Sequence, residues 1–265
     1  MFSETRMLPL LCALALACGC SVKEERNGCP RVIALDLSGV DTGALAAAGC
    51  GAMLVGMRSV RPPQETWEEL LDVESLPRVY EMTVPDDSVC LYALAATDFG
   101  GISGGELNIP AGEACPGIFS WRAAIPAGRE TSVPVTLHKD FCLIDITLER
   151  PFPPALSYVA VGGISGATLG GVPREGYFFC PLSPDSGGSC RLSVPRQKDS
   201  SLRLMVLEND DAVRYFALGY YMGLAGYDWG AEDLEDISVR VSLAKGSAAF
   251  NINLWPKTVI LDIVF

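Results

Sequence analysis

Apolar and polar residues alternate along much of this chain, which is typical of strands with one buried face. Phe141–Glu149 (FCLIDITLE) places Cys142, Ile144, Ile146 and Leu148 on one side. The same period of two recurs in four further segments: Arg31–Leu37, Ser201–Leu207, Ile237–Leu243 and Ala249–Trp255. This pattern predicts antiparallel strands with one face in a core and one in water. With turns rich in Gly, Pro, Asp and Ser between them, the strands predict an all-β fold made of β-sandwiches.

Helical patterning is scarce. Gln64–Leu71 (QETWEELL) follows two prolines and would place Trp67, Leu70 and Leu71 on one side of a short helix. Tyr227–Asp236 is a second candidate, for a single helical turn. Neither segment changes the all-β prediction.

Proline density marks one boundary inside the chain. Arg150–Pro154 (RPFPP) breaks both strand and helix, so it predicts an N-terminal β-sandwich over residues 31–149 and a C-terminal one over 150–265. The five-residue sequence GGISG occurs in both parts, at 100–104 and 162–166. Either a duplication or a shared loop chemistry explains the two copies.

The first residues carry an export signal. Met7–Gly19 (MLPLLCALALACG) is too short to span a bilayer and too apolar for a soluble terminus, so residues 1–19 are predicted to be a signal peptide. Cys20 follows a small residue, which resembles a bacterial lipobox and predicts lipidation at Cys20, with 20–30 as a lipidated linker. Cys18 is the alternative acceptor, and an ordinary secretory signal with incidental cysteines is the other interpretation.

Composition excludes several classes of partner. About 246 residues would remain after cleavage, with 49% apolar and 20% charged residues in the whole chain, which describes a globular protein with a substantial core. The net charge of −12 argues against nucleic acid as a partner, because binding it requires clustered Lys and Arg. It also argues against docking on anionic lipid, so attachment to a membrane would depend on the acyl chains.

Seven cysteines would remain beside Cys20, an odd number that cannot all pair within one chain. There is no CxxC motif and no Cys/His ligand spacing, so a zinc site is not expected. Cys142 is predicted to be a small core residue. Cys180 and Cys190 flank a turn-rich loop and are the pair most readily bridged; the other connectivities stay open.

Two apparent catalytic signals are weak. Ser103 lies in a G-x-S-x-G pattern, but no helix pattern follows it, as a nucleophile elbow requires, and His138 is the single histidine. We therefore expect a surface turn at Ser103 and an exposed polar side chain at His138. Acidic pairs stand in turn-like contexts without calcium-loop spacing, at Asp86-Asp87, Asp210-Asp211, Glu232-Asp233 and Glu235-Asp236. The prediction is a protein that is not an enzyme, with no cofactor and no metal.

Aromatic residues offer a second kind of site. Trp121, Tyr220, Tyr221, Tyr227 and Trp229 would suit an exposed platform for a glycan. Alternatively, the cluster over 220–229 packs inside the C-terminal sandwich, which is the favoured interpretation.

Several segments resemble one known family. Cys20-Ser-Val-Lys-Glu-Glu-Arg, followed by Asn27-Gly-Cys-Pro and the strand Val32–Leu37, is similar to the opening of Bacteroidota fimbrial anchor and minor-subunit lipoproteins. Val135–Leu148 resembles the strand pair that ends their first domain. Similarity continues over Gly226–Trp229, Asp233–Val239 and Ile252–Trp255. The Gly-rich centre, 100–126, departs from the family.

This resemblance implies two transthyretin-like β-sandwich domains and a place in a fimbrium, the type V pilus. It implies a palmitate-bearing surface lipoprotein in the outer membrane, exported there by the Lys-Glu-Glu run, whose partners are fimbrial stalk subunits. Such pili assemble by β-strand exchange. An anchor tied to lipid through Cys20 would keep its N-terminal strand, and Thr258–Phe265 would be either donated or simply the last strand. The alternative is a surface lipoprotein that binds a glycan or host ligand in cell adhesion.

Overall fold

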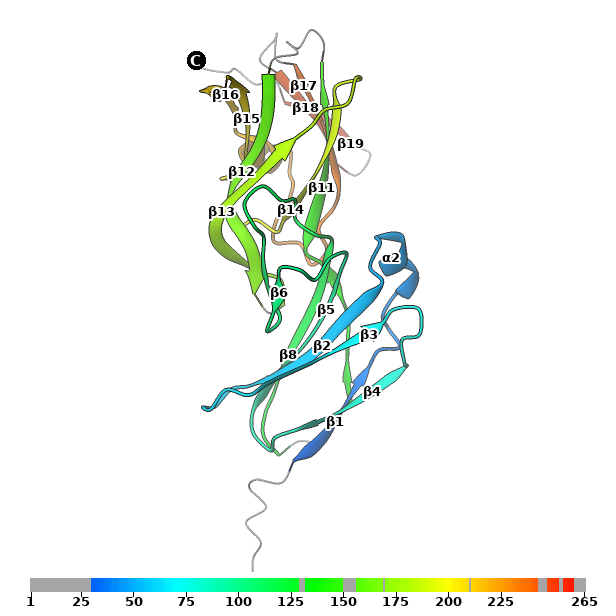
Figure 1. Cartoon of the computed structure of the whole chain (residues 1–265). Coiled ribbons are helices and arrows are strands. Elements are labelled where there is room, and N and C mark those ends of the chain that lie inside the picture. Colours follow the sequence, from blue (N-terminus) through cyan, green and yellow to red (C-terminus); the bar gives the residue numbers. More distant parts are fainter. Residues whose placement is uncertain are drawn as a thin grey trace, which may run out of the picture.

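The computed structural model describes residues 30–128, 132–149, 156–168, 170–209, 211–242, 247–252 and 255–259, and its elements are almost all strands (Figure 1). Cys20, the predicted signal peptide, nearly all of the predicted linker and the C-terminal residues 260–265 lie outside the described residues. Within the described part, neither helix is long and apolar enough to cross a membrane.

Two sheets form the lower body in Figure 1, which we call the N-terminal sandwich. The smaller sheet has the order β4 (Val79–Val84), β1 (Arg31–Asp36), β9 (Ser132–Pro134). The larger has the order β10 (His138–Lys139), β8 (Ile118–Ile125), β5 (Val89–Ala96), β2 (Ala52–Ser59), β3 (Thr66–Asp72). Helix α2 (Thr42–Ala47) connects β1 to β2, and the Asp41 side chain caps it by accepting from the Ala44 N–H at 2.9 Å.

The core of the N-terminal sandwich lies between these sheets. Ile33 and Leu35 of β1 face Met53 and Val55 of β2, and all four side chains are fully buried. Because alternate residues of a strand point to opposite faces, Val32 points outward and is half exposed. The period-two pattern predicted for the first strand is confirmed.

Two further sheets form the C-terminal sandwich, the upper body in Figure 1. One has the order β14 (Ser189–Pro195), β11 (Phe141–Leu148), β17 (Ile237–Ser242), β18 (Ser247–Ile252), β19 (Trp255–Val259). The other has the order β16 (Asp211–Phe216), β15 (Arg203–Glu208), β12 (Leu156–Thr168), β7 (Glu106–Asn108), β6 (Ile102–Ser103), with β13 (Val172–Leu182) also paired to β12. Helix α3 (Leu218–Leu224) follows β16.

The second core lies between these two sheets. The predicted inner face of β11 is confirmed, since Cys142, Ile144, Ile146 and Leu148 are each at most 2% exposed. The all-β sandwich fold predicted from alternation is therefore confirmed. Its strands are mostly antiparallel, but β1–β9 and β11–β17 pair in parallel.

Some strands that precede the predicted boundary at 149/150 pair with the C-terminal sandwich instead of the N-terminal one. β11 lies before residue 150 but pairs with β14 and β17 in the C-terminal sandwich. The hairpin β6–β7 also reaches the C-terminal sandwich, because Leu107 and Asn108 pair with β12. All three strands precede residue 150, so chain order alone assigns them to the N-terminal sandwich. The division into domains at 149/150 stays a prediction.

The two GGISG copies meet in this sheet on either side of β7. A Cβ carbon at Gly101 would lie 2.4 Å from the Asn108 carbonyl oxygen, and one at Gly166 would lie 2.2 Å from the Leu107 carbonyl oxygen. Only glycine permits so close an approach of neighbouring backbones. The repeated sequence therefore serves one strand junction.

Both helix predictions are wrong. Residues 66–71 belong to β3, whose pairing with β2 outweighs the local helical pattern, and Trp67 and Leu70 are exposed rather than buried. Tyr227–Asp236 holds no helix; the short helix α3 ends before it. The predicted strand Ala249–Trp255 is in fact two, β18 and β19, which form a hairpin in which Ile252 pairs with Trp255.

Candidate functional site

The first candidate site is the position of β1 in its sheet. β1 pairs with β4 over six residues, from Arg31 opposite Val84 to Asp36 opposite Val79, and with the short β9 on its other side. It is thus a central strand whose inner side chains fill the core.

Arg31 fastens the beginning of β1. Its guanidinium, largely buried, donates from Nη2 to the Asp87 carbonyl oxygen at 2.9 Å, and its Nε lies 4.0 Å from the Asp86 carboxylate. Asp86 in turn accepts from the Gly128 N–H at 3.0 Å. The acidic pair Asp86-Asp87 therefore tethers β1 to the turn between β4 and β5.

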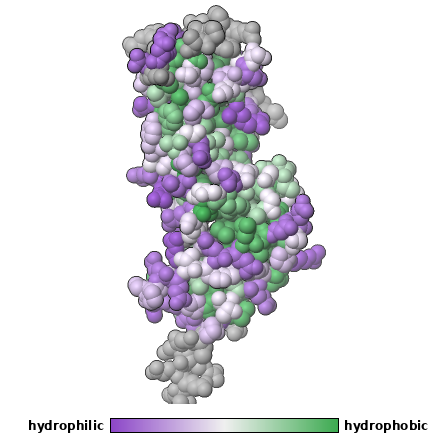
Figure 2. Space-filling model, in the orientation of Figure 1, coloured by the Kyte–Doolittle hydropathy of each residue, from purple (hydrophilic) through white to green (hydrophobic). Residues whose placement is uncertain are grey.

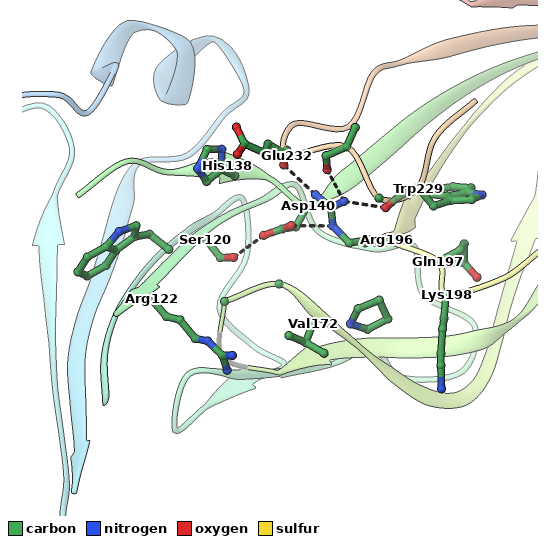
Figure 3. A pocket seen from close by; sticks show the side chains of 16 residues that line it. Ser120, Arg122, His138, Asp140, Val172, Arg196, Gln197, Lys198, Trp229 and Glu232 are labelled. Carbon is green, nitrogen blue, oxygen red and sulfur yellow. Dashed lines mark hydrogen bonds and ion pairs between the residues drawn. The ribbon is translucent and has the colours of Figure 1, made fainter. Parts of the chain in front are cut away.

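A cavity at the junction of the two sandwiches is the second candidate site (Figure 3). Its volume is about 650 Å³, and its walls come from β8, the β10–β11 junction, the β12–β13 turn and the segments after β14 and around 229–232. The residues that carry chemistry there are Ser120, Trp121, Arg122, His138, Asp140, Arg196, Lys198 and Glu232.

A buried ion pair forms one wall of this cavity. Asp140 accepts from the Ser120 hydroxyl and from Arg196 Nε at 3.0 Å, and both charged side chains are at most 13% exposed (Figure 3). The Arg196 backbone N–H also donates to the Asp140 carbonyl oxygen at 2.9 Å. The pair joins β8 and β11 to the end of β14.

Arg196 uses its remaining donors on backbone carbonyls. Nη1 donates to the oxygens of Trp229 at 2.7 Å and Ala231 at 2.5 Å, and Nη2 donates to that of Glu232 at 2.9 Å. Because the guanidinium group presents several donors in a fixed plane, this one side chain satisfies several backbone carbonyl groups of a loop that has no secondary structure.

The Asp140 side chain is only 5% exposed. Burial raises the pKa of the Asp140 carboxyl, although the Ser120 hydroxyl and the Arg196 guanidinium both favour its charged form. The β12–β13 turn closes over it, since a Cβ carbon at Gly171 would lie 2.3 Å from the carboxyl atoms and its φ is +72°. Neither Asp140 nor Arg196 was predicted from the sequence; the signal was a charged residue directly beside an apolar strand.

The other predicted residues of chemical interest take structural positions. Ser103 is exposed in the hairpin β6–β7, whose turn residues Gly104 and Gly105 both have positive φ, and no helix follows. His138 is half-buried, with Nδ1 3.5 Å from the Asp233 carboxylate. Ser103 lies beside a surface turn, as expected, whereas His138 is less exposed than expected.

Two other acidic residues, Asp233 and Asp236, also lie at the junction of the two sandwiches. Asp233 accepts from the Lys139 N–H at 2.8 Å, and Asp236 accepts from the Leu143 N–H at 2.8 Å and from Lys139 Nζ at 2.5 Å. These carboxylates hold the loop 229–236 against β10 and β11. Asp210 lies outside the described residues.

The aromatic residues do not form one platform. Tyr227 is buried and packs edge-on against Trp229 with ring centroids 4.7 Å apart, so both belong to the C-terminal core. Tyr220 is exposed on α3, and Trp121 packs partly against the N-terminal core. The favoured interpretation, packing rather than a flat glycan platform, fits Tyr227 and Trp229 but not Tyr220.

The predicted bridge between Cys180 and Cys190 is wrong, since both are free thiols. Cys180 lies opposite Ala160 in the sheet of β12, whereas Cys190 lies opposite Ile146 in the sheet of β11, so the loop between them connects two different sheets. Among the described residues, no group of three or more His, Cys, Asp or Glu side chains could hold a metal ion.

No family model and no curated protein sequence matches this chain. Solved structures do match in fold. The fimbrial anchor protein Mfa2 from Porphyromonas gingivalis has a TM-score of 0.60 and 12% sequence identity, covering 87% of this chain and 99% of its own. A candidate polysaccharide-binding protein from Bacteroides thetaiotaomicron has a TM-score of 0.57 and 10% identity, covering 87% and 98%. A candidate adhesin from Bacteroides ovatus has a TM-score of 0.53 and 12% identity, covering 90% and 97%. The resemblance to Bacteroidota fimbrial proteins is thus confirmed as a shared fold.

Proposed function

We propose that this chain is a surface lipoprotein, lipidated at Cys20, that acts as the anchor or a minor subunit of a Bacteroidota fimbria of the type V pilus class. It is not an enzyme, its partners are fimbrial stalk subunits, and its place is the outer face of the outer membrane. The fold shared with Mfa2, described as a fimbrial anchor protein, supports this proposal.

The observation that carries the anchor role is the seating of β1. Ile33 and Leu35 are fully buried, so removing the strand would expose two side chains whose burial stabilises the fold by about 1.5–3 kcal/mol each. A subunit whose first strand leads back to a lipid cannot lose that strand and remain attached. It therefore keeps its own groove filled and joins the pilus by donating a strand, for which Thr258–Phe265 is the candidate.

Substitution of Cys20 tests this proposal in cells. Cys20→Ala should abolish palmitate labelling and release long pili into the medium, while Cys18→Ala, at the alternative acceptor, should leave both unchanged. Loss of label with pili still attached at normal length would exclude the anchor role. Label that survives in Cys20→Ala and disappears in Cys18→Ala would move the lipid to Cys18.

The second candidate function is binding of a glycan or host ligand at the junction cavity. The observation in its favour is a hollow of about 650 Å³ lined by Trp121, Arg122 and His138, a combination that suits a polar ring with an apolar face. Trp121→Ala should then abolish binding on a glycan array, whereas Trp67→Ala, at an exposed tryptophan elsewhere, should not. An array negative for the wild-type chain would remove this candidate.

A further inference from the structure

β3 is a regular strand at the free edge of its sheet. Among the described strands it pairs with β2 alone, in seven consecutive pairs from Thr66 opposite Arg58 to Asp72 opposite Ala52, without a register shift. It contains no proline or glycine, and no backbone hydrogen bond joins it to any other described element. Such an edge presents unpaired donors and acceptors to solvent.

The hydrogen bonds at the two ends of the β2–β3 pairing show which residues of β3 have unpaired backbone groups. Ser59 N–H donates to the Glu65 carbonyl oxygen at 2.8 Å, and Val73 N–H donates to that of Gly51 at 3.1 Å. Since antiparallel pairs alternate between bonded and non-bonded, the odd-numbered residues of β3 bond to β2. The N–H and C=O groups of the even-numbered residues therefore point to the free edge: Thr66, Glu68, Leu70 and Asp72.

β13 shows how the same molecule blunts another long edge. Its pairing with β12 has two register shifts, and it contains Pro173 and Pro181. These are devices that keep an edge from accepting another strand. β3 has neither.

The segment that carries β3 holds charges of one sign. Residues 62–77 hold five acids and no Lys or Arg: Glu65, Glu68, Glu69, Asp72 and Glu74. Glu68 accepts from the Tyr92 hydroxyl at 2.7 Å and Glu69 from the Tyr80 hydroxyl at 2.5 Å, and both donors are neutral. None of the five carboxylates takes part in an ion pair with a described residue. Two copies of this edge would repel each other, whereas a basic segment would be attracted.

Apolar surface accompanies the acids. Trp67 is 38% exposed and Leu70 is 55% exposed, and they lie on opposite faces of β3. Beside Trp67, a groove of about 650 Å³ opens between β3 and β4, with Met57 and Val84 in its walls. Figure 2 shows apolar side chains gathered on the neighbouring face, over β2 and β5.

We infer that the free edge of β3 binds an extended segment of another protein as an added antiparallel strand, in which two adjacent basic residues lie opposite Glu68 and Glu69 and apolar residues lie opposite Trp67 and Leu70. Main-chain bonds supply the attachment, and the alternating side chains supply the choice of partner. The apolar residue opposite Trp67 enters the groove. This surface is separate from the seat of β1 and does not depend on the anchor role.

A peptide with a central Val-Lys-Arg-Val tests the inference on the purified full chain. Its fluorescence anisotropy should rise saturably, and a matched peptide with Val-Glu-Glu-Val should bind at least about tenfold more weakly. Affinity for the basic peptide should fall as salt is added. Equal binding of the two peptides, or no binding of either, would overturn the inference.

Leu70→Pro is the decisive variant. It removes one outward N–H while leaving the bonds from Trp67, Glu69 and Leu71 to β2, so peptide binding should be lost. Leu70→Thr keeps the N–H and should retain most of the affinity. Unchanged binding by a folded Leu70→Pro chain would contradict strand addition.

Two further measurements cover the other outcomes. If Leu70→Pro does not fold, hydrogen exchange on the wild-type chain replaces it: the peptide should slow exchange at Glu68 and Leu70, and unchanged exchange there would overturn the inference. Sedimentation covers self-association. A dimer of the wild-type chain that Leu70→Pro abolishes would make a second copy the occupant and exclude the basic partner.

Discussion

The ring of Tyr92 on β5 lies directly over Gly56 on β2, so closely that a Cβ carbon at position 56 would lie 2.5 Å from the Tyr92 Cζ. The hydroxyl of the same ring donates to Glu68 on β3 at 2.7 Å. One side chain thus crosses three strands of the sheet. Burial raises the pKa of Tyr92 well above its usual range, and the Glu68 carboxylate raises it further, so the phenol remains a neutral donor at physiological pH.

Gly56→Ala should destabilise the protein. The added methyl group would overlap the Tyr92 ring, and overpacking of this kind costs about 1–3 kcal/mol. Gly51→Ala is the matched control, because nothing lies within 4 Å of a Cβ carbon there. In urea denaturation, the unfolding midpoint of Gly56→Ala should be lower than that of the wild type, and the midpoint of Gly51→Ala should be unchanged. Equal midpoints for the two variants would mean that the Tyr92 ring moves aside without cost.

Leu35→Ala should loosen β1. The side chain is 0% exposed, so its truncation leaves a cavity and should lower the free energy of unfolding by about 2–5 kcal/mol. Val32→Ala on the outward face of the same strand should cost less than about 1 kcal/mol. The comparison by urea denaturation separates the packing of β1 from its backbone pairing, and similar losses in both variants would contradict the assigned faces.

Arg196→Met should break the junction between the sandwiches. It leaves the Asp140 carboxyl buried without its cation and removes bonds to four backbone carbonyls, for which we expect a loss of about 3–5 kcal/mol. Arg191→Met removes an exposed pair with Asp145 and should cost at most about 1 kcal/mol. A small effect at Arg196, measured by thermal or urea unfolding, would show that the pair does not hold the junction.

The contribution of Asp140 to the free energy of unfolding should decrease as pH rises. Because burial raises its folded pKa above the unfolded value of about 3.9, the folded chain keeps the proton to a higher pH than the unfolded chain. The free energy of unfolding of the wild type, relative to Asp140→Asn, should therefore fall as pH rises from about 4 through the raised pKa, and then level off. Urea titrations across this interval measure it. A relative stability that grows with pH would mean that the Arg196 charge outweighs burial.

Period-two alternation was enough to predict β1 and β11 with their correct inner faces, because a strand with one buried face has apolar residues at every second position. It failed at 64–71, where Trp67, Leu70 and Leu71 also fit a helical face. What decides there is the pairing with β2, a contact that local pattern does not contain.

The junction could not be predicted for a related reason. Asp140 and Arg196 are 56 residues apart, and a charged residue in a sequence does not reveal its partner. The same limit applies to Cys180 and Cys190, whose closeness in sequence suggested a bond although their strands belong to opposite sheets.

The crossing of β7 and β11 into the C-terminal sandwich bears on how the chain can be divided. A fragment that began at residue 150 would lack the strand between β14 and β17 and would leave the β7 side of β12 open. A fragment that ended at 149 would carry the apolar face of β11 into water. A cut between residues 149 and 150 would therefore divide the sheets of the C-terminal sandwich, and we expect neither half to fold as an independent module.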